Sequence, residues 1–209
     1  SFVGLFTAIA TLGLDGIVVR ELVKDESRRD ELIGTAFYLK LIGAIAVLIV
    51  LAVAIQFTSN DHYTNVLVFI IASATIFQAF NVVDMYFQAK VLSKYVVYAN
   101  VISLFISSIV KIVLILNDAP LIAFAWATLF DSVVLALGFI YYYVKNSSIF
   151  NIKNLTFKRE TAVSLLKDSW PLILSGIVIS IYMKIDQVMI QEMMGSESVG
   201  QYAAATRLS

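Results

Sequence analysis

The chain has 209 residues, of which 60% are hydrophobic and 14% are charged, and its formal net charge is zero. About a quarter of the residues in a soluble domain are charged, so the composition indicates a polytopic helical membrane protein and gives no basic field for nucleic acid. The lack of cysteine excludes disulfides and thiolate metal sites, and a single histidine, His62, cannot form a zinc site. We expect no metal and no cofactor.

Apolar runs of about 20 residues, the length needed to cross a bilayer, follow one another along the chain. A partial span covers residues 1–14, and a further helix begins near Ser198. Five full spans are predicted between them, at about 33–57, 66–89, 95–116, 120–144 and 170–194. Pro120 and Pro171 each fall in the first turn of a span, where the missing N–H costs no helical hydrogen bond. The predicted fold class is an all-α membrane protein, a polytopic transmembrane helix bundle.

The loops between the spans alternate in their content of lysine and arginine. Basic loops and loops without any basic residue follow each other in the order 20–31, 56–65, 89–94, 117–120, 145–167 and 191–200. By the positive-inside rule, the first, third and fifth of these loops are expected in the cytoplasm. The longest loop contains "FKRETAVSLLKDS", in which apolar residues alternate with charges, and this pattern predicts a short interfacial helix.

Two similar stretches lie at the ends of the chain, "SFVGLFTAIATL" and "ESVGQYAAATRL". Val3 aligns with Val199, and the six crossings between them return the chain to the same side of the membrane. The stretches predict a parallel repeat of two six-helix halves, unless the match of these common residues is accidental. We therefore expect a fragment of a longer protein, with residues 1–144 an incomplete first half, 145–168 a cytoplasmic linker with an interfacial helix, and 169–209 the start of the second half.

Three motifs resemble the polysaccharide transporter family, the O-antigen and polysaccharide flippases of the multidrug/oligosaccharidyl-lipid/polysaccharide exporter superfamily. They are "VGLFTAIATLGLDGIVVRELVKD", "DMYFQAKVLSKYVVYANVIS", and "LLKDSWPLILSGIVISIYMKIDQVMI" followed by "MGSESVGQYAAATRLS". The resemblance implies that the chain covers roughly helices two to eight. It also implies a carrier in the bacterial inner membrane, not an enzyme. Such a carrier moves an undecaprenyl-diphosphate-linked oligosaccharide, such as an O-antigen unit, from the cytoplasmic to the periplasmic leaflet by alternating access.

Several ionisable residues lie inside the predicted spans, where a charge costs roughly 2.5–3.5 kcal/mol. Lys184 and Asp186 are near the middle of the last full span and about 200° apart around a helix. This spacing favours a helix with a hydrated cavity on one side and other helices on the other. Lys111 and Asp131 lie in the third and fourth full spans, and Arg207 lies near the end of the chain.

A diphosphate head group would bind cations, so Lys184, Lys111 and Arg207 are the predicted substrate-binding residues. Asp186 and Asp131 are the predicted ion-coupling residues, for a proton or a sodium ion. The expected partners are the lipid-linked oligosaccharide, the lipid bilayer, the coupling ion and polysaccharide assembly proteins. We expect no catalytic residue, no metal ligand and no nucleic acid.

Three other interpretations remain open. In the first, the intramembrane charges form structural ion pairs only, and serine, asparagine and glutamine in the spans bond neighbouring helices, as they commonly do. A multidrug or cation antiporter of the same superfamily is the alternative function, although Lys111, Lys184 and Arg207 favour an anionic substrate. An intramembrane enzyme would need a catalytic histidine or a large external loop, and neither is evident in the sequence.

Lys40 lies less than two turns from a basic loop and is expected to extend its ammonium to the membrane surface.

Overall fold

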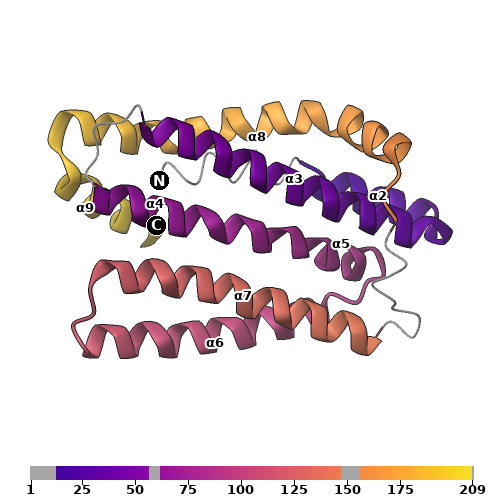
Figure 1. Ribbon diagram of the computed structural model, residues 1–209, viewed down its shortest axis with the longest axis horizontal. Helices are drawn as coiled ribbons and strands as arrows, with labels where there is room; N and C mark the ends of the chain where they lie inside the picture. The colour runs from indigo at the N-terminus through magenta and orange to yellow at the C-terminus, as the bar shows by residue number, and fades with distance from the viewer. Residues whose placement is uncertain (1–12, 57–61, 147–155, 209) are drawn as a thin grey trace.

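The computed structural model describes residues 13–56, 62–146 and 156–208, and all regular structure within them is helical. The predicted partial span at residues 1–14 lies almost entirely outside the described residues. The elements, shown in Figure 1, are α2 (Asp15–Lys24), η1 (Glu26–Arg28), α3 (Arg29–Gln56), α4 (His62–Phe77), η2 (Gln78–Asn81), α5 (Val82–Ala89), α6 (Lys94–Leu116), α7 (Leu121–Asn146), α8 (Arg159–Met194) and α9 (Ser196–Leu208). In the described part of the chain, five helical segments are long and apolar enough to cross a membrane. The all-α polytopic membrane fold is thereby confirmed.

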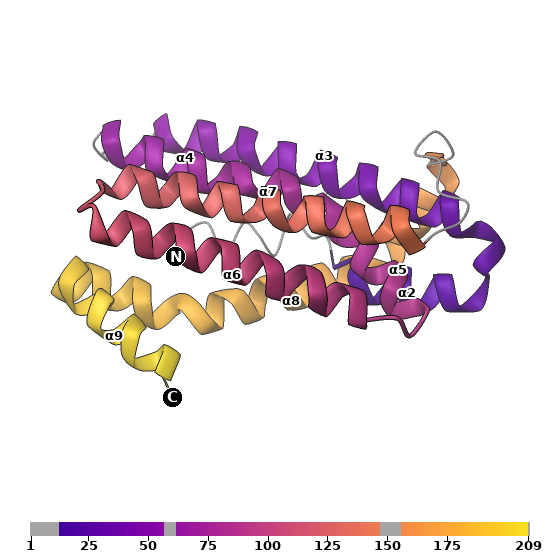
Figure 2. The same cartoon turned by 90° about the horizontal axis from the view of Figure 1, so that it is seen from below.

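The long helices lie side by side with their axes roughly aligned, as the two perpendicular views in Figures 1 and 2 show. The α2–α3 and α5–α6 turns, the end of α7 and the start of α8 gather at one end of the bundle, on the right of Figure 1. This end, here called the basic end, carries the lysines and arginines of residues 20–31, 89–94, 145 and 158–167. The α6–α7 and α8–α9 turns lie at the opposite end. Within the described residues, the basic turns and the α6–α7 and α8–α9 turns, which carry no basic residue, therefore lie at opposite ends of one bundle.

The largest group of buried apolar side chains lies toward the basic end, where α2, α3, α5 and α7 meet. It includes Leu14, Val18, Leu32, Ile33, Met85, Phe87 and Tyr143, each no more than 3% exposed. Tyr86 and Tyr143 pack edge to face there, with ring centroids 5.0 Å apart. By contrast, α6 exposes most of its isoleucine, leucine and phenylalanine side chains, as a helix in contact with lipid does.

The second predicted full span, residues 66–89, is not one continuous α-helix. It divides into α4 and α5 around the short 3-10 helix η2, where the N–H of Val82 bonds the carbonyls of Ala79 and Phe80. Phe80 packs against Phe37 of α3 with ring centroids 5.2 Å apart. Polar side chains such as Asn81 also favour turns over helix interiors. The apolar pattern gives no sign of this break because both helices are apolar.

The fifth full span was predicted to begin near Trp170, after a separate interfacial helix. In the structure the two form a single helix, α8, and Pro171 lies inside it rather than in its first turn. The polar start of α8 continues into the span because one of its faces packs against α2 and α3 through Ala162, Leu165 and Ser169. The helix that was predicted to begin near Ser198 is confirmed as α9.

Candidate functional site

The predicted residues Lys111 and Asp131 come together between α6 and α7. Lys111 Nζ lies 3.8 Å from Asp131 Oδ2, and the two side chains are 43% and 36% exposed. Ser103 Oγ donates a hydrogen bond of 3.0 Å to the other carboxylate oxygen, Asp131 Oδ1. The carboxylate is therefore held from one side by a hydroxyl and from the other by an ammonium.

A second serine of α6 adds an unused polar group to this pair. Ser107 lies four residues from both Ser103 and Lys111, so the three residues share one face of α6. The Ser107 hydroxyl is buried and has no hydrogen-bond partner in the part of the chain that the structure describes. The Asp131 carboxylate bonds one of these hydroxyls, that of Ser103, and the other lies on the same face of α6. A carboxylate bonded to a hydroxyl can hold a proton or a monovalent cation in place of the lysine ammonium.

Small residues allow α6 and α7 to approach closely enough for these contacts. A Cβ added to Gly138 of α7 would lie 3.2 Å from the Cβ of Ala99 of α6. Such close packing of small residues is the usual way in which membrane helices associate. The close contact of Ala99 and Gly138 thus sets the register in which Ser103, one turn further along α6, meets Asp131, two turns earlier on α7.

Asp186 lies in a different part of the molecule, on α8. Its Oδ2 accepts a hydrogen bond of 3.1 Å from the hydroxyl of Tyr202 on α9. The chain reverses between α8 and α9 at Gly195, whose φ of +84° is left-handed and suits glycine. The side chains of Lys184 and Arg207 lie outside the described residues, although α8 and α9 include both positions.

The structure contradicts the expectation for Lys40. Its side chain is only 3% exposed, and its Nζ bonds Asp15 Oδ1 at 2.6 Å instead of reaching the membrane surface. A buried ammonium needs a partner, and α2 supplies one at its first turn. Sequence reasoning missed Asp15, and the one available signal was a lone acid in the otherwise apolar stretch "TLGLDGIVV".

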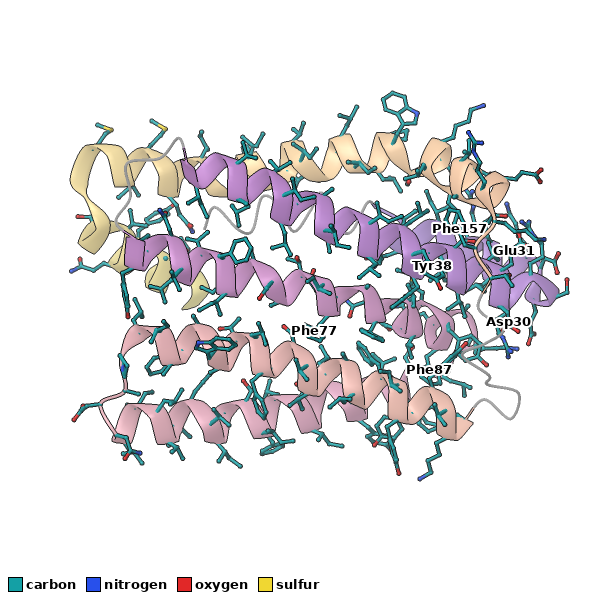
Figure 3. All side chains as sticks on the ribbon, in the orientation of Figure 1. Asp30, Glu31, Tyr38, Phe77, Phe87 and Phe157 are labelled. Atoms are coloured by element: carbon teal, nitrogen blue, oxygen red, sulfur yellow. The ribbon has the colours of Figure 1, made fainter. Side chains whose placement is uncertain are left out.

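Sequence reasoning also missed Glu31, which lies at the start of α3 near Phe157 and the first turn of α8 (Figure 3). Its carboxylate accepts hydrogen bonds from Lys158 Nζ at 2.5 Å, Thr161 Oγ1 at 2.5 Å and Arg28 Nη2 at 2.7 Å. No sequence signal distinguishes Glu31 from the other charges of "DESRRDE", because two of its three partners, Lys158 and Thr161, are about 130 residues away.

A second contact at the basic end joins α2 to α8. Arg20 Nη2 donates to Asp168 Oδ2 at 2.9 Å, and Arg20 Nε donates to Glu21 Oε1 at 3.0 Å. The hydrogen bond from Lys24 to Glu21, at 2.8 Å, lowers the pKa of Glu21, and the bond from Arg20 adds to this effect. Glu21 is thus kept anionic beside Arg20. Among the described residues, no group of three histidine or acidic side chains could hold a metal ion.

One comparison with known proteins agrees with this architecture. A family model described as polysaccharide biosynthesis protein matches residues 1–209. No curated protein and no solved structure gives a significant match. The match covers the whole chain, including α6 and α7 with their Lys111–Asp131 pair. The chain therefore belongs to the polysaccharide biosynthesis protein family, a family of polysaccharide and O-antigen flippases.

Proposed function

We propose that the protein moves an undecaprenyl-diphosphate-linked oligosaccharide from the cytoplasmic to the periplasmic leaflet of the bacterial inner membrane. The observation that carries the proposal is the Lys111–Asp131 pair inside a membrane bundle of this family. Charges within spanning helices are expensive unless they pair or face water or a ligand, and Lys111 and Asp131, loosely paired at 3.8 Å, stay partly exposed to water or a ligand. A carrier of a charged lipid head group brings both water and a charged ligand to these residues.

In this proposal, Lys111 contributes positive charge for the diphosphate, together with Lys184 and Arg207. An ammonium near phosphate oxygens forms charge-assisted hydrogen bonds, about twice as strong as neutral ones. The 3.8 Å separation between Lys111 and Asp131 is longer than a direct hydrogen bond, so the ammonium can leave the carboxylate for an anionic substrate.

Asp131 is the proposed ion-coupling residue. When Lys111 turns to the substrate, the carboxylate loses its counter-charge and gains a proton or a sodium ion, with the Ser103 and Ser107 hydroxyls as further ligands. Substrate and ion are thereby linked through one pair of side chains. Asp186, which bonds Tyr202, is the second proposed coupling residue. Alternating access would expose this region first to the cytoplasm and then to the periplasm.

The test is complementation of a bacterial strain that lacks its own lipid-linked oligosaccharide flippase and makes a glycan matched to this protein. The protein is expressed from its complete gene, alone and as Lys111→Met, Asp131→Asn, Lys184→Ala and Asp186→Ala variants. Surface polysaccharide is measured, with the membrane protein level as control. Lys94→Gln is the matched control variant. It also removes a lysine from α6, but at the basic end, where Lys94 stacks on Tyr95 far along the helix from Lys111.

We expect the unaltered protein and Lys94→Gln to restore surface polysaccharide. Lys111→Met and Asp131→Asn should lower the amount of surface polysaccharide by at least tenfold. If transport limits that amount, a tenfold loss corresponds to a transport barrier raised by about 1.4 kcal/mol. Equal restoration by all variants would show that the intramembrane charges are structural. Failure of the unaltered protein with a matched glycan would contradict the flippase proposal, and a drug-efflux assay would then test the antiporter alternative.

A further inference from the structure

The first three turns of α8, residues 159–170, are fastened to the N-terminal helices by a set of polar contacts. This stretch is here called the docked segment. Glu31 binds Thr161 and also Lys158, the residue just before the helix. The backbone N–H of Lys158 donates to Thr35 Oγ1 at 3.2 Å, and Arg20 binds Asp168 two turns further along. Four side chains from α2, η1 and α3 thereby hold α8, because Arg28 also donates to Thr161 at 3.1 Å.

Burial on α8 is confined to this same stretch. Thr161, Ala162 and Leu165 are each no more than 5% exposed, and Ser169 is fully buried. After Ser169, none of the α8 side chains that the structure describes is buried. The remaining part of the helix, residues 172–194 and here called the arm, therefore buries none of its described side chains against α2 and α3. It contacts Gly13 at Leu172, and it contacts α9 through the hydrogen bond of Asp186 with Tyr202.

The boundary between the two parts coincides with a weak point in the helix. Pro171 has no N–H for the carbonyl of Lys167 and its ring crowds that turn, so it breaks the helical ladder there. Ser169 Oγ bonds the carbonyl of Leu165 at 2.7 Å, a back-bond that often bends helices. Two independent causes of bending thus lie within three residues of the point where burial stops.

We propose that Glu31 is a positioning residue that keeps the docked segment of α8 fixed to α2 and α3, and that the arm bends relative to it at Pro171 during transport. The bending step rests on the proposed transport function, whereas the fastening by Glu31 does not. The arm carries Lys184 and Asp186, so its bending would move two of the proposed site residues while the basic end stays fixed. Glu31 touches no substrate in this scheme and acts only through α8.

The fastening can be tested by distances between spin labels, since the native chain has no cysteine. The protein, expressed from its complete gene, is reconstituted into bilayers with cysteines at the exposed positions Val23 and Val163, which report on the docked segment. A second pair, Val23 and Ile181, reports on the arm. We expect a narrow distance distribution for the first pair and a broad or double one for the second.

The variant Glu31→Ala should broaden the Val23–Val163 distribution, and Glu160→Ala, which removes an exposed carboxylate from the same turn of α8, should not. Pro171→Ala restores the helical N–H and should narrow the Val23–Ile181 distribution, whereas Pro171→Gly should leave it broad. An equally broad Val23–Val163 distribution in the unaltered protein would overturn the fastening. Insensitivity of that distribution to Glu31→Ala would overturn the role of Glu31.

Transport provides the second readout of the hinge. In the complementation assay, Pro171→Ala should lower surface polysaccharide several-fold at equal membrane protein level, and Pro171→Gly should stay close to the unaltered protein. Equal transport by both variants would overturn the role of Pro171 in the transport cycle. If the unaltered protein itself does not transport, the proposed function fails. The spin-label distances still decide whether Glu31 fastens α8 and whether the arm bends.

Discussion

Lys40 illustrates how a buried side chain in a membrane bundle depends on its partner, which in the described part of the chain is Asp15. Its ammonium is almost fully enclosed, while Asp15 at the other end of the bond has a side chain that is 63% exposed. The two groups therefore differ in what their removal leaves behind. Loss of Asp15 leaves a buried, unpaired cation, whereas loss of Lys40 leaves a carboxylate that is still mostly accessible.

This asymmetry gives a prediction for the stability of single variants. Asp15→Ala should destabilise the folded protein by about 1–3 kcal/mol, because it leaves the buried ammonium of Lys40 without its partner. Lys40→Met removes that charge with a side chain of similar volume and should cost less than about 1.5 kcal/mol. The measurement is thermal denaturation of the purified protein in detergent.

The double variant is the control for this prediction. Asp15→Ala combined with Lys40→Met should be no less stable than Asp15→Ala alone, since no unpaired ammonium remains. Equal destabilisation by the two single variants, with additive effects in the double variant, would show that the pair has no energetic coupling. The 2.6 Å contact would then contribute nothing to folding.

At the scale of elements, the contact between α6 and α7 depends on two small residues. Gly138 lies against Ala99 so closely that even a methyl group at Gly138 would require an adjustment of the helices. The polar contacts of Asp131 with Ser103 and Lys111 form only while the two helices remain in this register. The packing of α6 on α7 and the geometry of the proposed site therefore both depend on Gly138, although this residue has no side chain.

The variant Gly138→Leu should force α6 and α7 apart. We expect a loss of about 1–3 kcal/mol of stability, typical of overpacking, and a loss of transport at least as large as that of Asp131→Asn. Gly16→Leu is the matched control, because no described atom lies within 4 Å of a Cβ at Gly16. Thermal denaturation and complementation measure the two effects. Unchanged transport by Gly138→Leu would show that the α6–α7 register is irrelevant to function.

The sequence predicts the membrane-spanning helices better than the points where helices break or continue. Runs of apolar residues locate all five full spans, because each must present about 20 such residues to lipid. The 3-10 turn at residues 78–81 and the continuation of α8 through Pro171 escape prediction, since both depend on contacts with other helices. Likewise, the pattern selects Lys111 and Asp131 individually, but their pairing depends on the register of α6 against α7.

For the whole molecule, the distribution of charge at the two ends is the feature that governs orientation. The basic end gathers lysines and arginines from turns that are distant in sequence, and the opposite end has none in its α6–α7 turn (residues 117–120). Because positively charged loops are retained in the cytoplasm, the basic end should face inward. Glu31 and the docked segment of α8 would then lie on the cytoplasmic side.

This orientation can be tested with single cysteines in the naturally cysteine-free chain. Asn117→Cys lies in the α6–α7 turn and Ser93→Cys in the α5–α6 turn, and both residues are exposed. A membrane-impermeant maleimide should label Asn117→Cys in cells with a permeabilised outer membrane, and it should label Ser93→Cys only after the inner membrane is opened. The unaltered chain gives the background. The reverse pattern would place the basic end in the periplasm, so that Glu31 would fasten α8 on the side of release instead of the side where the lipid-linked oligosaccharide enters.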